Sequence, residues 1–581
     1  MRRMLPTLFF LVLCCADLSA QKGSNAGDTT EFANGSRVVL QSLFPNQIDN
    51  LSLLGKVWGF LKYYHPVVAE GYFNWDYELF RILPTYLHAV NNTDRDGMLL
   101  SWINRLGNIG SCKKCVEEIK NEYVKPDLDW INADQLSDSL KNLLNFIRFN
   151  RHQGRNYYVE LMPRVGNPNI LNENPYRQFI CPDAGYRLLA LFRYWNIIQY
   201  WFPDKHLIGE DWKNVLPEFI PKFVAAKNEM EYWNTVQQLI ARIHDSHANL
   251  LASFPEWNNR FGKYYPPCMV TFVGDDPVVS IIVNDTLARL SNIQRGDVIK
   301  KVNGETIANI ITERLPNLPG SNYSTQLRDL AIPLLRSKDS ITDLTIERAG
   351  QEIACRLHHF MTAKWSEWYH FDFPYQKDSS FFFISPGIGY INLGGIKKKQ
   401  VDSVFKALEG SKGLIIDNRQ YPSDFALYEI AAKLNPEPRP FAKFPIGNID
   451  YPGSLSITKP ISAGKKTKDY YNGMVVILVN ENTQSSAEFH SMAFRTAPNV
   501  TVIGSTTAGA DGNVTNFFFL PGNLFTRFTG IGVLYPDGKE TQRVGVVPDI
   551  EVKRTVRGIK DGRDELVEKA IALINSEGGS L

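Results

Sequence analysis

The clearest change of pattern along the chain runs from residue 475 to residue 489. Five apolar residues, 475–479, predict a buried strand, and the polar residues 480–484 predict a turn. Helical spacing of apolar residues begins directly after Ser485, which therefore stands at a helix start. A serine there can cap the helix, or it can attack a carbonyl while the first N–H groups of the helix stabilise the oxyanion. Capping is the commoner use, so a catalytic interpretation needs a base, an oxyanion donor and a substrate groove elsewhere in the chain.

Apolar strand candidates alternate with amphipathic helices beyond residue 364. This β-α-β-α order predicts an α/β layer with a largely parallel sheet, whose sites lie at the carboxyl ends of the strands. Ser485 and the loop after Asp417 both follow such ends. The strand candidates are 387–393, 413–417, 475–479, 500–504, 516–520 and 531–534, and the helix candidates are 399–408 and 425–434.

The first half of the chain repeats itself at a fixed offset of 137 residues, without gaps. Each copy is predicted to form two or three amphipathic helices with aromatic residues on the buried face. The matched pairs are Trp58 and Trp195, Trp75 and Trp212, Pro84 and Pro221, Asn91 and Asn228, Ile103 and Ile240, and Arg105 and Arg242.

The two copies end differently. His244 and His247 occupy positions that are Gly107 and Gly110 in the first copy, so the helical scaffold itself requires no histidine there. A purely structural role for His244 and His247 is therefore less favoured than it would be for two arbitrary histidines. A His-x-x-His metal site is the weaker alternative, because it needs a third ligand and no Glu or His lies close by in sequence.

A β-rich section follows at about residues 268–360. Its strand candidates are 270–273, 278–283, 297–302 and 343–348, with one helix near 326–336. Residues 290–304, which end in a Val-Asn-Gly turn, resemble the signature of PDZ domains, a family that binds extended peptides at an open sheet edge. The alternative is an ordinary small β domain with an Asn-Gly hairpin.

Charge and composition restrict the partners and the compartment. With 63 basic and 61 acidic residues, the chain shows no sign of a nucleic-acid partner or of an anionic membrane surface as a partner. Residues 1–20 read as a secretory signal, and no later segment is apolar enough for a transmembrane helix. We therefore expect an exported protein that is periplasmic, in the cell envelope or secreted. Leu13 argues against a lipid anchor at Cys14.

Five cysteines remain after removal of the signal, an odd number that argues against a disulfide scaffold. Cys112 and Cys115 can form a local disulfide in an oxidising compartment or supply two metal ligands. Metal is the weaker option, because the chain has no second Cys-x-x-Cys and no histidine pair nearby.

Ser485 needs a proton acceptor if it is a nucleophile. His490 lies further along the same predicted helix and points away, so we interpret it as structural. The loop 504–512 contains no lysine, which excludes a local Ser/Lys pair. His247 remains the best base, provided that the fold brings it to Ser485.

Six motifs follow one another in order: Asp245-Ser-His247, Gly387-Ile-Gly-Tyr-Ile391, Gly413-Leu-Ile-Ile-Asp-Asn-Arg419, the residues 479–488, Gly504-Ser-Thr-Thr-Ala-Gly509 and Gly545-Val-Val-Pro-Asp-Ile550. Together, over about residues 239–552, they resemble the serine peptidases of the C-terminal processing (tail-specific) family. The resemblance implies a ClpP/crotonase-like α/β core with an inserted PDZ domain. One branch of that family has a lysine where this chain has Ala510, so the chain is similar to the tricorn-like Ser/His branch.

The resemblance also assigns roles to residues. It implies Ser485 as the nucleophile, His247 as the base, Ser246 as a supporting hydroxyl and Glu540 as the group that orients His247, with Asp245 as the alternative orienter. The N–H groups of Ser486 and of Ser423 in the loop 418–424 would hold the oxyanion. That loop usually carries two glycines after a proline, whereas this chain has Pro422-Ser-Asp424, which restricts the backbone there.

The sequence thus predicts a multidomain α+β protein with a helical repeat region, a PDZ-like β domain and a ClpP/crotonase-like α/β catalytic core. The predicted function is an exported serine endopeptidase without a metal or other cofactor. Its partners would be peptide or unfolded protein substrates, with C-terminal tails docked on the PDZ-like domain. The alternatives are a non-catalytic ligand- or peptide-binding protein on the same fold and a peptide-tethering module; the oligomeric state is left open.

The predicted boundaries are 1–20 (signal peptide), 21–150 (first helical unit), 151–262 (second helical unit, with His247), 263–362 (PDZ-like domain), 363–556 (peptidase core) and 557–581 (C-terminal helix).

Overall fold

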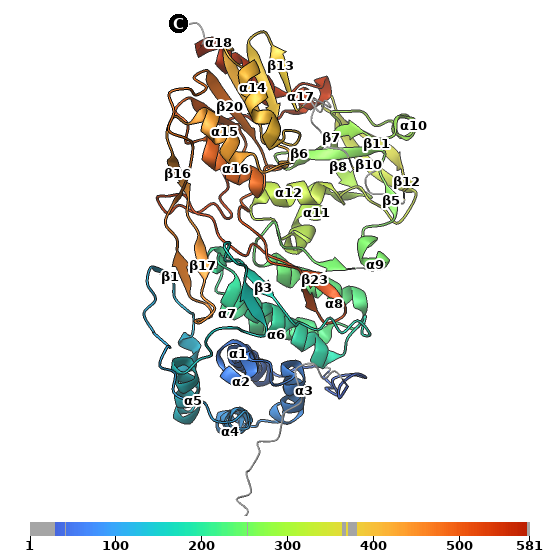
Figure 1. Ribbon diagram of the computed structural model, residues 1–581. Helices are drawn as coiled ribbons and strands as arrows, with labels where there is room; N and C mark the ends of the chain where they lie inside the picture. Colours follow the sequence, from blue (N-terminus) through green and yellow to red (C-terminus); the bar gives the residue numbers. More distant parts are fainter. Residues whose placement is uncertain (1–29, 41, 253, 363–367, 370–379, 578–581) are drawn as a thin grey trace, which may run out of the picture.

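The computed structural model describes residues 30–577, apart from 41, 253, 363–367 and 370–379. The predicted signal at 1–20 therefore lies outside the described residues. Figure 1 shows an elongated molecule with the amino-terminal helices at one end and the carboxyl-terminal half at the other. No helix among the described residues is both long enough and apolar enough to cross a membrane.

Two sets of three helices share one core at the helical end. The second and third helices of one set begin 137 residues before those of the other. In the first set the Trp58 and Trp75 indoles each donate to the other's backbone carbonyl, at 3.0 and 2.9 Å. Trp195 and Trp212 make the same reciprocal pair, at 2.9 and 3.1 Å. Because a buried indole N–H needs an acceptor, each pair fixes how the first helix packs against the second.

The helices of the first set are α1 (Pro45–Tyr64), α3 (Trp75–Tyr86) and α4 (Asn92–Asn104), and those of the second are α6 (Ala184–Trp201), α7 (Trp212–Ala225) and α8 (Glu229–Ala241). The other elements of this end are α2 (Pro66–Ala69), α5 (Asp138–Phe149), α9 (Pro255–Asn258), β1 (Glu122–Val124), β2 (Val159–Leu161), β3 (Pro168–Ile170), β4 (Leu251–Ala252), β5 (Tyr264–Tyr265) and the 3-10 turns Asp129–Asn132 and Lys205–Leu207.

An antiparallel sheet in the order β11-β10-β8-β7-β6 follows, and its outer strand β6 packs beside helix α12. Its apolar core includes Cys268 of β6 and Leu327 and Leu330 of α12. The elements are β6 (Cys268–Val273), β7 (Asp276–Ile282), α10 (Asp285–Leu290), β8 (Val298–Val302), β9 (Glu305–Thr306), α11 (Ile307–Arg314), the 3-10 turn Leu315–Asn317, α12 (Tyr323–Ala331), β10 (Ile341–Arg348), β11 (Gln351–His358) and β12 (Phe360–Met361).

The carboxyl-terminal half is built on a six-stranded sheet in the order β13-β14-β15-β20-β21-β24, parallel except for the edge strand β13. Alternate residues of each strand face opposite layers. Ile416 and Ile477 pack with helices α14 to α16, whereas Ile415 and Val476 pack with α18. Because both faces are covered, β20 is apolar throughout and β15 is apolar up to Asp417 at its end, as the sequence pattern indicates.

The elements of this half are β13 (Phe381–Ser385), β14 (Ile388–Asn392), the 3-10 turn Lys398–Gln400, α14 (Val401–Ala407), β15 (Gly413–Asp417), α15 (Leu427–Leu434), β16 (Arg439–Ala442), β17 (Pro445–Gly447), β18 (Leu455–Ile457), β19 (Ile461–Ala463), β20 (Met474–Val479), α16 (Ser486–Phe494), β21 (Val500–Gly504), β22 (Phe518–Leu520), β23 (Leu524–Thr526), β24 (Ile550–Glu551), α17 (Val556–Asp561) and α18 (Glu565–Glu577). The predicted strand 531–534 is wrong: its apolar side chains are buried, but only Leu534 takes part in isolated bridges, to Lys443 and Glu540.

Two small sheets join the helical end to the carboxyl-terminal half. β4, which follows His247 in sequence, pairs with β23, and β1 pairs with β18 of the hairpin β17–β18. Figure 1 shows β1, β17 and β23 at this junction, although they lie far apart in the chain. The junction thus connects the chain just after α8, through β4, to β23 of the carboxyl-terminal half.

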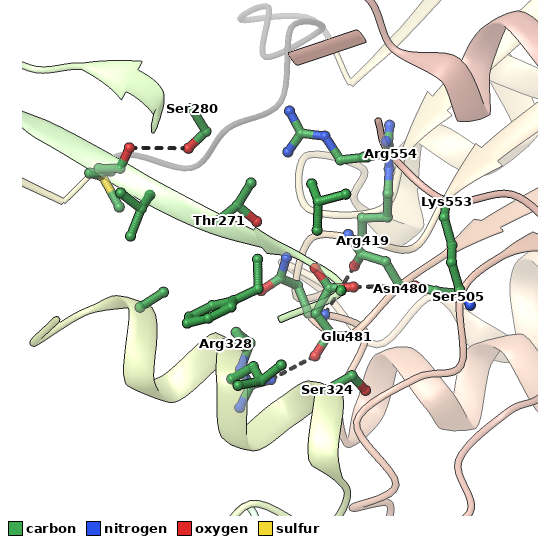
Figure 2. Close-up of a pocket in the computed structure, with 18 of the residues that line it drawn as sticks. Thr271, Ser280, Ser324, Arg328, Arg419, Asn480, Glu481, Ser505, Lys553 and Arg554 are labelled. Carbon is green, nitrogen blue, oxygen red and sulfur yellow. Dashed lines mark hydrogen bonds between the residues drawn. The ribbon is translucent and has the colours of Figure 1, made fainter. Parts of the chain in front are cut away.

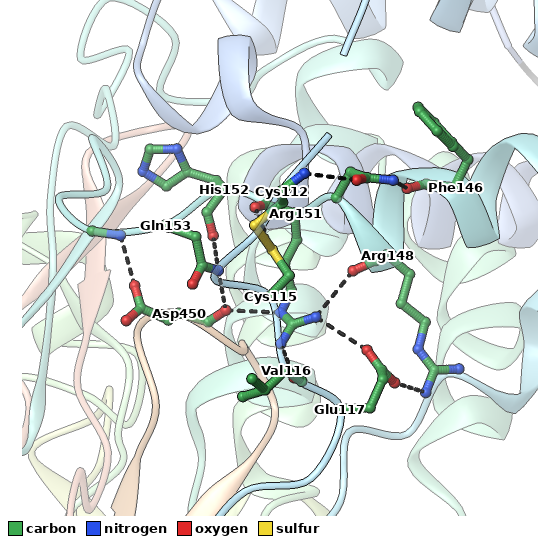
Figure 3. The surroundings of a disulfide bond; sticks show 12 residues. Cys112, Cys115, Val116, Glu117, Phe146, Arg148, Arg151, His152, Gln153 and Asp450 are labelled. Atoms are coloured by element: carbon green, nitrogen blue, oxygen red, sulfur yellow. Dashed lines mark hydrogen bonds and ion pairs between the residues drawn. A yellow bond between two sulfur atoms is a disulfide. The ribbon is translucent and has the colours of Figure 1, made fainter. Parts of the chain in front are cut away.

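Cys112 and Cys115 form a disulfide just before β1. The segment that follows it carries Glu117, which forms ion pairs with Arg148 and Arg151, at 2.8 and 3.2 Å. Arg151 also donates to the Asp450 carbonyl at 2.9 Å and lies over the Tyr451 ring. Figure 3 shows the Arg151 guanidinium between the loop at Asp450 on one side and Glu117 and Arg148 on the other. The disulfide segment is thus part of the contact between the helical end and the β17–β18 hairpin.

Candidate functional site

Ser485 lies at the carboxyl end of β20 and directly before α16, as the sequence pattern predicts. Its backbone is left-handed, with φ 57° and ψ −123°, a conformation that costs a non-glycine residue about 1 to 3 kcal/mol. No side-chain capping hydrogen bond comes from its hydroxyl. The Ser485 N–H donates to the Ala510 carbonyl at 3.1 Å and to Glu488 at 3.0 Å. These two hydrogen bonds of its N–H group therefore hold the strained backbone of Ser485, and its hydroxyl is not used as a helix cap.

Glu488 performs the capping that Ser485 does not. Its carboxylate is fully buried and accepts from the Ser485 N–H, from the Thr507 hydroxyl at 2.5 Å, and from the N–H groups of Gly509 and Ala510 at 2.8 and 3.1 Å. Burial raises the pKa of Glu488, and these four hydrogen bonds oppose the rise. Glu488 thus couples the position of Ser485 to the loop 507–510.

His247 lies in the turn after α8, with its side chain only 7% exposed. Its Nδ1 is 2.9 Å from the Thr529 hydroxyl, which in turn donates to Asp245 Oδ1 at 2.8 Å. Asp245 is fully buried and also accepts the His247 N–H at 3.0 Å and the Thr529 N–H at 2.6 Å. The direct separation between His247 Nδ1 and Asp245 Oδ1 is 3.7 Å, too long for a hydrogen bond. Thr529 therefore stands between the imidazole and the carboxylate.

Burial lowers the pKa of His247 below its usual value. The positive charges of Arg527 and Arg328 lower this pKa further, while the Asp245 carboxylate opposes them. The neutral imidazole, which is the form that accepts a proton, is consequently favoured over a wider pH range than in water.

The turn with His247 and the loop beside Ser485 are tied together through the start of α12. Ser246 and Ser321 exchange backbone and hydroxyl hydrogen bonds of 2.8 to 3.0 Å. The next residue, Asn322, donates to the Thr507 carbonyl at 2.8 Å. On the other side, a Cβ added to Gly512 would lie 3.1 Å from the Thr529 methyl group. Both His247 and Ser485 are thus anchored to the segment 507–512.

The remaining residues predicted from the sequence have other partners. Glu540 accepts from Tyr123 at 2.7 Å and lies 2.9 Å from His206 Nε2, so the structure does not bring it to His247. The Ser423 N–H, which the sequence predicts in the oxyanion hole, instead donates to the Leu393 carbonyl at 3.3 Å. Glu540 thus contacts Tyr123 and His206 in place of His247, and the Ser423 N–H is used in a backbone hydrogen bond.

Other predicted residues keep the places that the sequence suggests. The Ser486 N–H is at the first position of α16, where helical N–H groups have no partner within the helix. His490 is fully buried, and its Nδ1 donates to the Ser486 carbonyl at 2.5 Å. Ser246 supports the position of the turn through Ser321.

A cavity of about 650 Å³ lies between β6 and α12 on one side and the loop after β20 on the other. Met269, Phe272 and Leu327 give it an apolar wall, and charged residues at 553–554 lie opposite. Figure 2 shows Arg328 of α12 reaching the Glu481 carbonyl across it. Arg328, which lines the cavity, also donates to the Gln484 side chain at 3.1 Å, and Gln484 precedes Ser485 in the chain, although neither Gln484 nor Ser485 lines the cavity.

Two residues of this site were missed from the sequence. Glu488 stands three positions after Ser485, a spacing typical of a capping box, which is the signal that could have revealed it. Thr529 lies 282 residues from His247 in a segment without a motif, and no sequence signal points to it.

The comparisons with known proteins bear on the family of the carboxyl-terminal half and on the fold. Residues 387–552 match the model of peptidase family S41. Among solved structures, mature CPAF complexed with lactacystin matches with a TM-score of 0.51 and 14% identity over 67% of this chain and 98% of that one. A CPAF mutant matches with a TM-score of 0.54 and 15% identity over 68% and 98%. These likenesses show a shared fold.

A putative peptidase from Parabacteroides merdae aligns at a TM-score of 0.40, with 18% identity over 69% of this chain and 99% of that one. None of the curated proteins matches the sequence. The family match covers strands β14 to β24, including Ser485 and Glu488. Residues 387–552 of this chain are therefore a serine peptidase domain of family S41.

Proposed function

We propose that the protein is an exported endopeptidase that cleaves peptide bonds through an acyl-enzyme on Ser485, with His247 as the general base. The observation that carries the proposal is the anchoring of both residues to the segment 507–512. Ser485 bonds to Ala510, and the partner of His247, Thr529, packs against Gly512. A nucleophile and a base from distant parts of the chain are therefore fixed to one common support, as a catalytic pair requires.

In the proposed mechanism, His247 Nε2 takes the proton of the Ser485 hydroxyl as its oxygen attacks the substrate carbonyl. The Ser486 N–H at the start of α16 receives the negative charge that forms on the carbonyl oxygen, assisted by the helix dipole. His247 then returns the proton to the departing amine, and water hydrolyses the acyl-enzyme by the same steps. Ser246 supports the turn that carries His247.

The cavity beside β6 supports a peptide or an unfolded protein as substrate. β6 is an outer strand of its sheet, so its edge can pair with an extended chain, as in PDZ domains. An apolar side chain of that segment would contact Met269 and Leu327. In this proposal, a chain tail bound there extends toward Ser485 by way of Gln484, which Arg328 of the cavity wall contacts.

Export is supported by the disulfide between Cys112 and Cys115, because such bonds persist mainly in oxidising compartments. It agrees with the secretory signal predicted at residues 1–20.

Labelling with a fluorophosphonate probe tests the proposed function. We expect the wild-type protein to be labelled at neutral pH and Ser485→Ala to lose labelling and hydrolysis of casein. Ser403→Ala, on an exposed part of the same half, serves as the matched control and should be labelled normally. Labelling that persists in Ser485→Ala would refute the assignment of the nucleophile.

A further inference from the structure

The hydrogen bonds around Asp245 define where each proton of the His247 site lies. An ionised carboxylate has no proton to donate, so every hydrogen bond to Asp245 must be donated by its partner. The Thr529 hydroxyl has a single proton, and its bond to Asp245 Oδ1, at 2.8 Å, uses it. At its other contact, 2.9 Å from His247 Nδ1, the same oxygen can only accept. That contact therefore requires a proton on Nδ1.

We infer that Thr529 is a positioning residue that sets the tautomer of His247, holding the proton on Nδ1 so that Nε2 presents a free electron pair to Ser485. This inference rests on the proposed function and adds to it a residue that relays the effect of Asp245. Thr529 takes the place that a directly bonded carboxylate occupies in a Ser-His-Asp triad.

The geometry leaves the carboxylate unable to do this alone. Asp245 Oδ1 is 3.7 Å from Nδ1, and Asp245 already receives two backbone N–H groups, those of His247 and Thr529. These two bonds fix the backbone of both segments, whereas the hydroxyl is the group that contacts the ring. Thr529 is fully buried, so water cannot take the place of its hydroxyl without a rearrangement.

The decisive comparison is between two substitutions at one position. Thr529→Ser retains the hydroxyl, and we expect its rate of fluorophosphonate labelling to stay within about 3-fold of the wild type. Thr529→Val retains the shape but removes the hydroxyl, and we expect a fall of about 10²-fold, the lower range for loss of general-base assistance. Thr526→Val is the matched control: Thr526 is equally buried, but its hydroxyl donates to the Arg527 backbone carbonyl, at 3.3 Å.

The pH dependence separates this role from a merely structural one. The charged groups that act on His247 are Asp245, Arg527 and Arg328, and none of them is altered in Thr529→Val. Removal of the acceptor for Nδ1–H destabilises the imidazolium, so the acid limb of labelling should move to lower pH in Thr529→Val and remain in place in Thr526→Val.

A second measurement reads the tautomer of His247 directly and needs no substitution of Thr529. In protein labelled with ¹⁵N-histidine, the His247 resonances can be identified by their absence in His247→Gln. At neutral pH we expect the shifts of a protonated Nδ1 and an unprotonated Nε2. The opposite tautomer, or a Thr529→Ser variant as slow as Thr529→Val, would overturn the inference. If Ser485→Ala and His247→Ala lose labelling but Thr529→Val does not, only this inference fails; if those two variants retain labelling, the proposed function fails.

Discussion

The third helices of the two helical sets end in the same backbone turn, yet the proposed site uses the end of the second set and not that of the first. Gly107 after α4 and His244 after α8 occupy matching positions and both have positive φ, 100° and 49°. A left-handed backbone costs a residue with a side chain about 1 to 2 kcal/mol, whereas it suits glycine. The second set therefore retains a less favourable residue at the same turn.

The surroundings explain the difference. Cβ atoms added to Gly107 and Gly110 would meet nothing within 4 Å, so the first turn has open space around it. The second turn packs against α12 through Ser246 and against the segment at Thr529 through Asp245. One helical scaffold thus gives either a surface turn or half of a site, depending on what docks against its end.

Substitution of His247 should have the largest effect and tests this contrast directly. We expect His247→Ala to lower kcat/KM for casein by about 10³-fold or more, because the proton of Ser485 loses its acceptor. Gly110→His, which places a histidine at the matching position of the first set, should change nothing, since no nucleophile lies there. Equal activity of wild type and His247→Ala would remove the functional distinction between the two turns.

The carboxylate partner of the second turn should have the next largest effect. The two oxygens of Asp245 together accept three hydrogen bonds; Asp245→Asn removes the negative charge and replaces one of these oxygens by an NH₂ donor, and we expect kcat to fall by about 10²- to 10⁴-fold with little change in KM. Glu540→Gln should change kcat by less than about 3-fold, because Glu540 contacts Tyr123 and His206 instead. Steady-state kinetics of both variants decide between the two carboxylates, and a larger loss at Glu540 would restore the assignment made from the sequence.

The pH profile should show a smaller but directional effect. Burial, Arg527 and Arg328 lower the pKa of His247 against the opposing charge of Asp245. Because the neutral imidazole is the base in the proposed mechanism, we expect activity to be lost only as pH falls through this lowered value. We therefore expect the acid limb of kcat/KM to lie below pH 6.5, the ordinary histidine value. An acid limb above that value would mean that the imidazole is more exposed, or more strongly paired with Asp245, than the structure indicates.

Which residues are buried could be predicted from the sequence, whereas hydrogen bonds between residues far apart in the chain could not. The strand and helix around Ser485 follow from runs of apolar residues, and β20 and α16 match them closely. The apolar residues 531–534 are also buried, but they form no regular strand because burial alone does not require a neighbour in a sheet. Thr529 and Glu540 are polar residues in irregular segments, and their contacts depend on how distant loops fold together. The sequence could therefore suggest His247 and Asp245, two residues apart in one motif, but not the hydroxyl between them.

The smallest expected effect concerns stability and again compares the two helical sets. His65, after α1, aligns with Phe202, after α6, and both side chains are buried. Neither ring nitrogen of His65 has a hydrogen-bond partner among the described residues, and burial lowers the pKa of His65 to about 4. Between about pH 4 and 6.5 the unfolded chain therefore binds a proton that the folded chain does not. The contribution of His65 to the free energy of unfolding is therefore fully present above pH 6.5. As the pH falls from 6.5 to about 4, the free energy of unfolding decreases by up to about 1.4 kcal/mol per pH unit.

His65→Phe removes this titration, so the free energy of unfolding should depend less steeply on pH between 4.5 and 6.5. Phe202→His is the mirror substitution and should add the same dependence to the second set. Urea titrations followed by tryptophan fluorescence at several pH values measure both slopes, and the slope is informative even if the larger phenyl ring shifts absolute stability. An unchanged slope in His65→Phe would show that the histidine is hydrated or paired in solution. The two sets would then differ in polarity at this position without any consequence for acid stability.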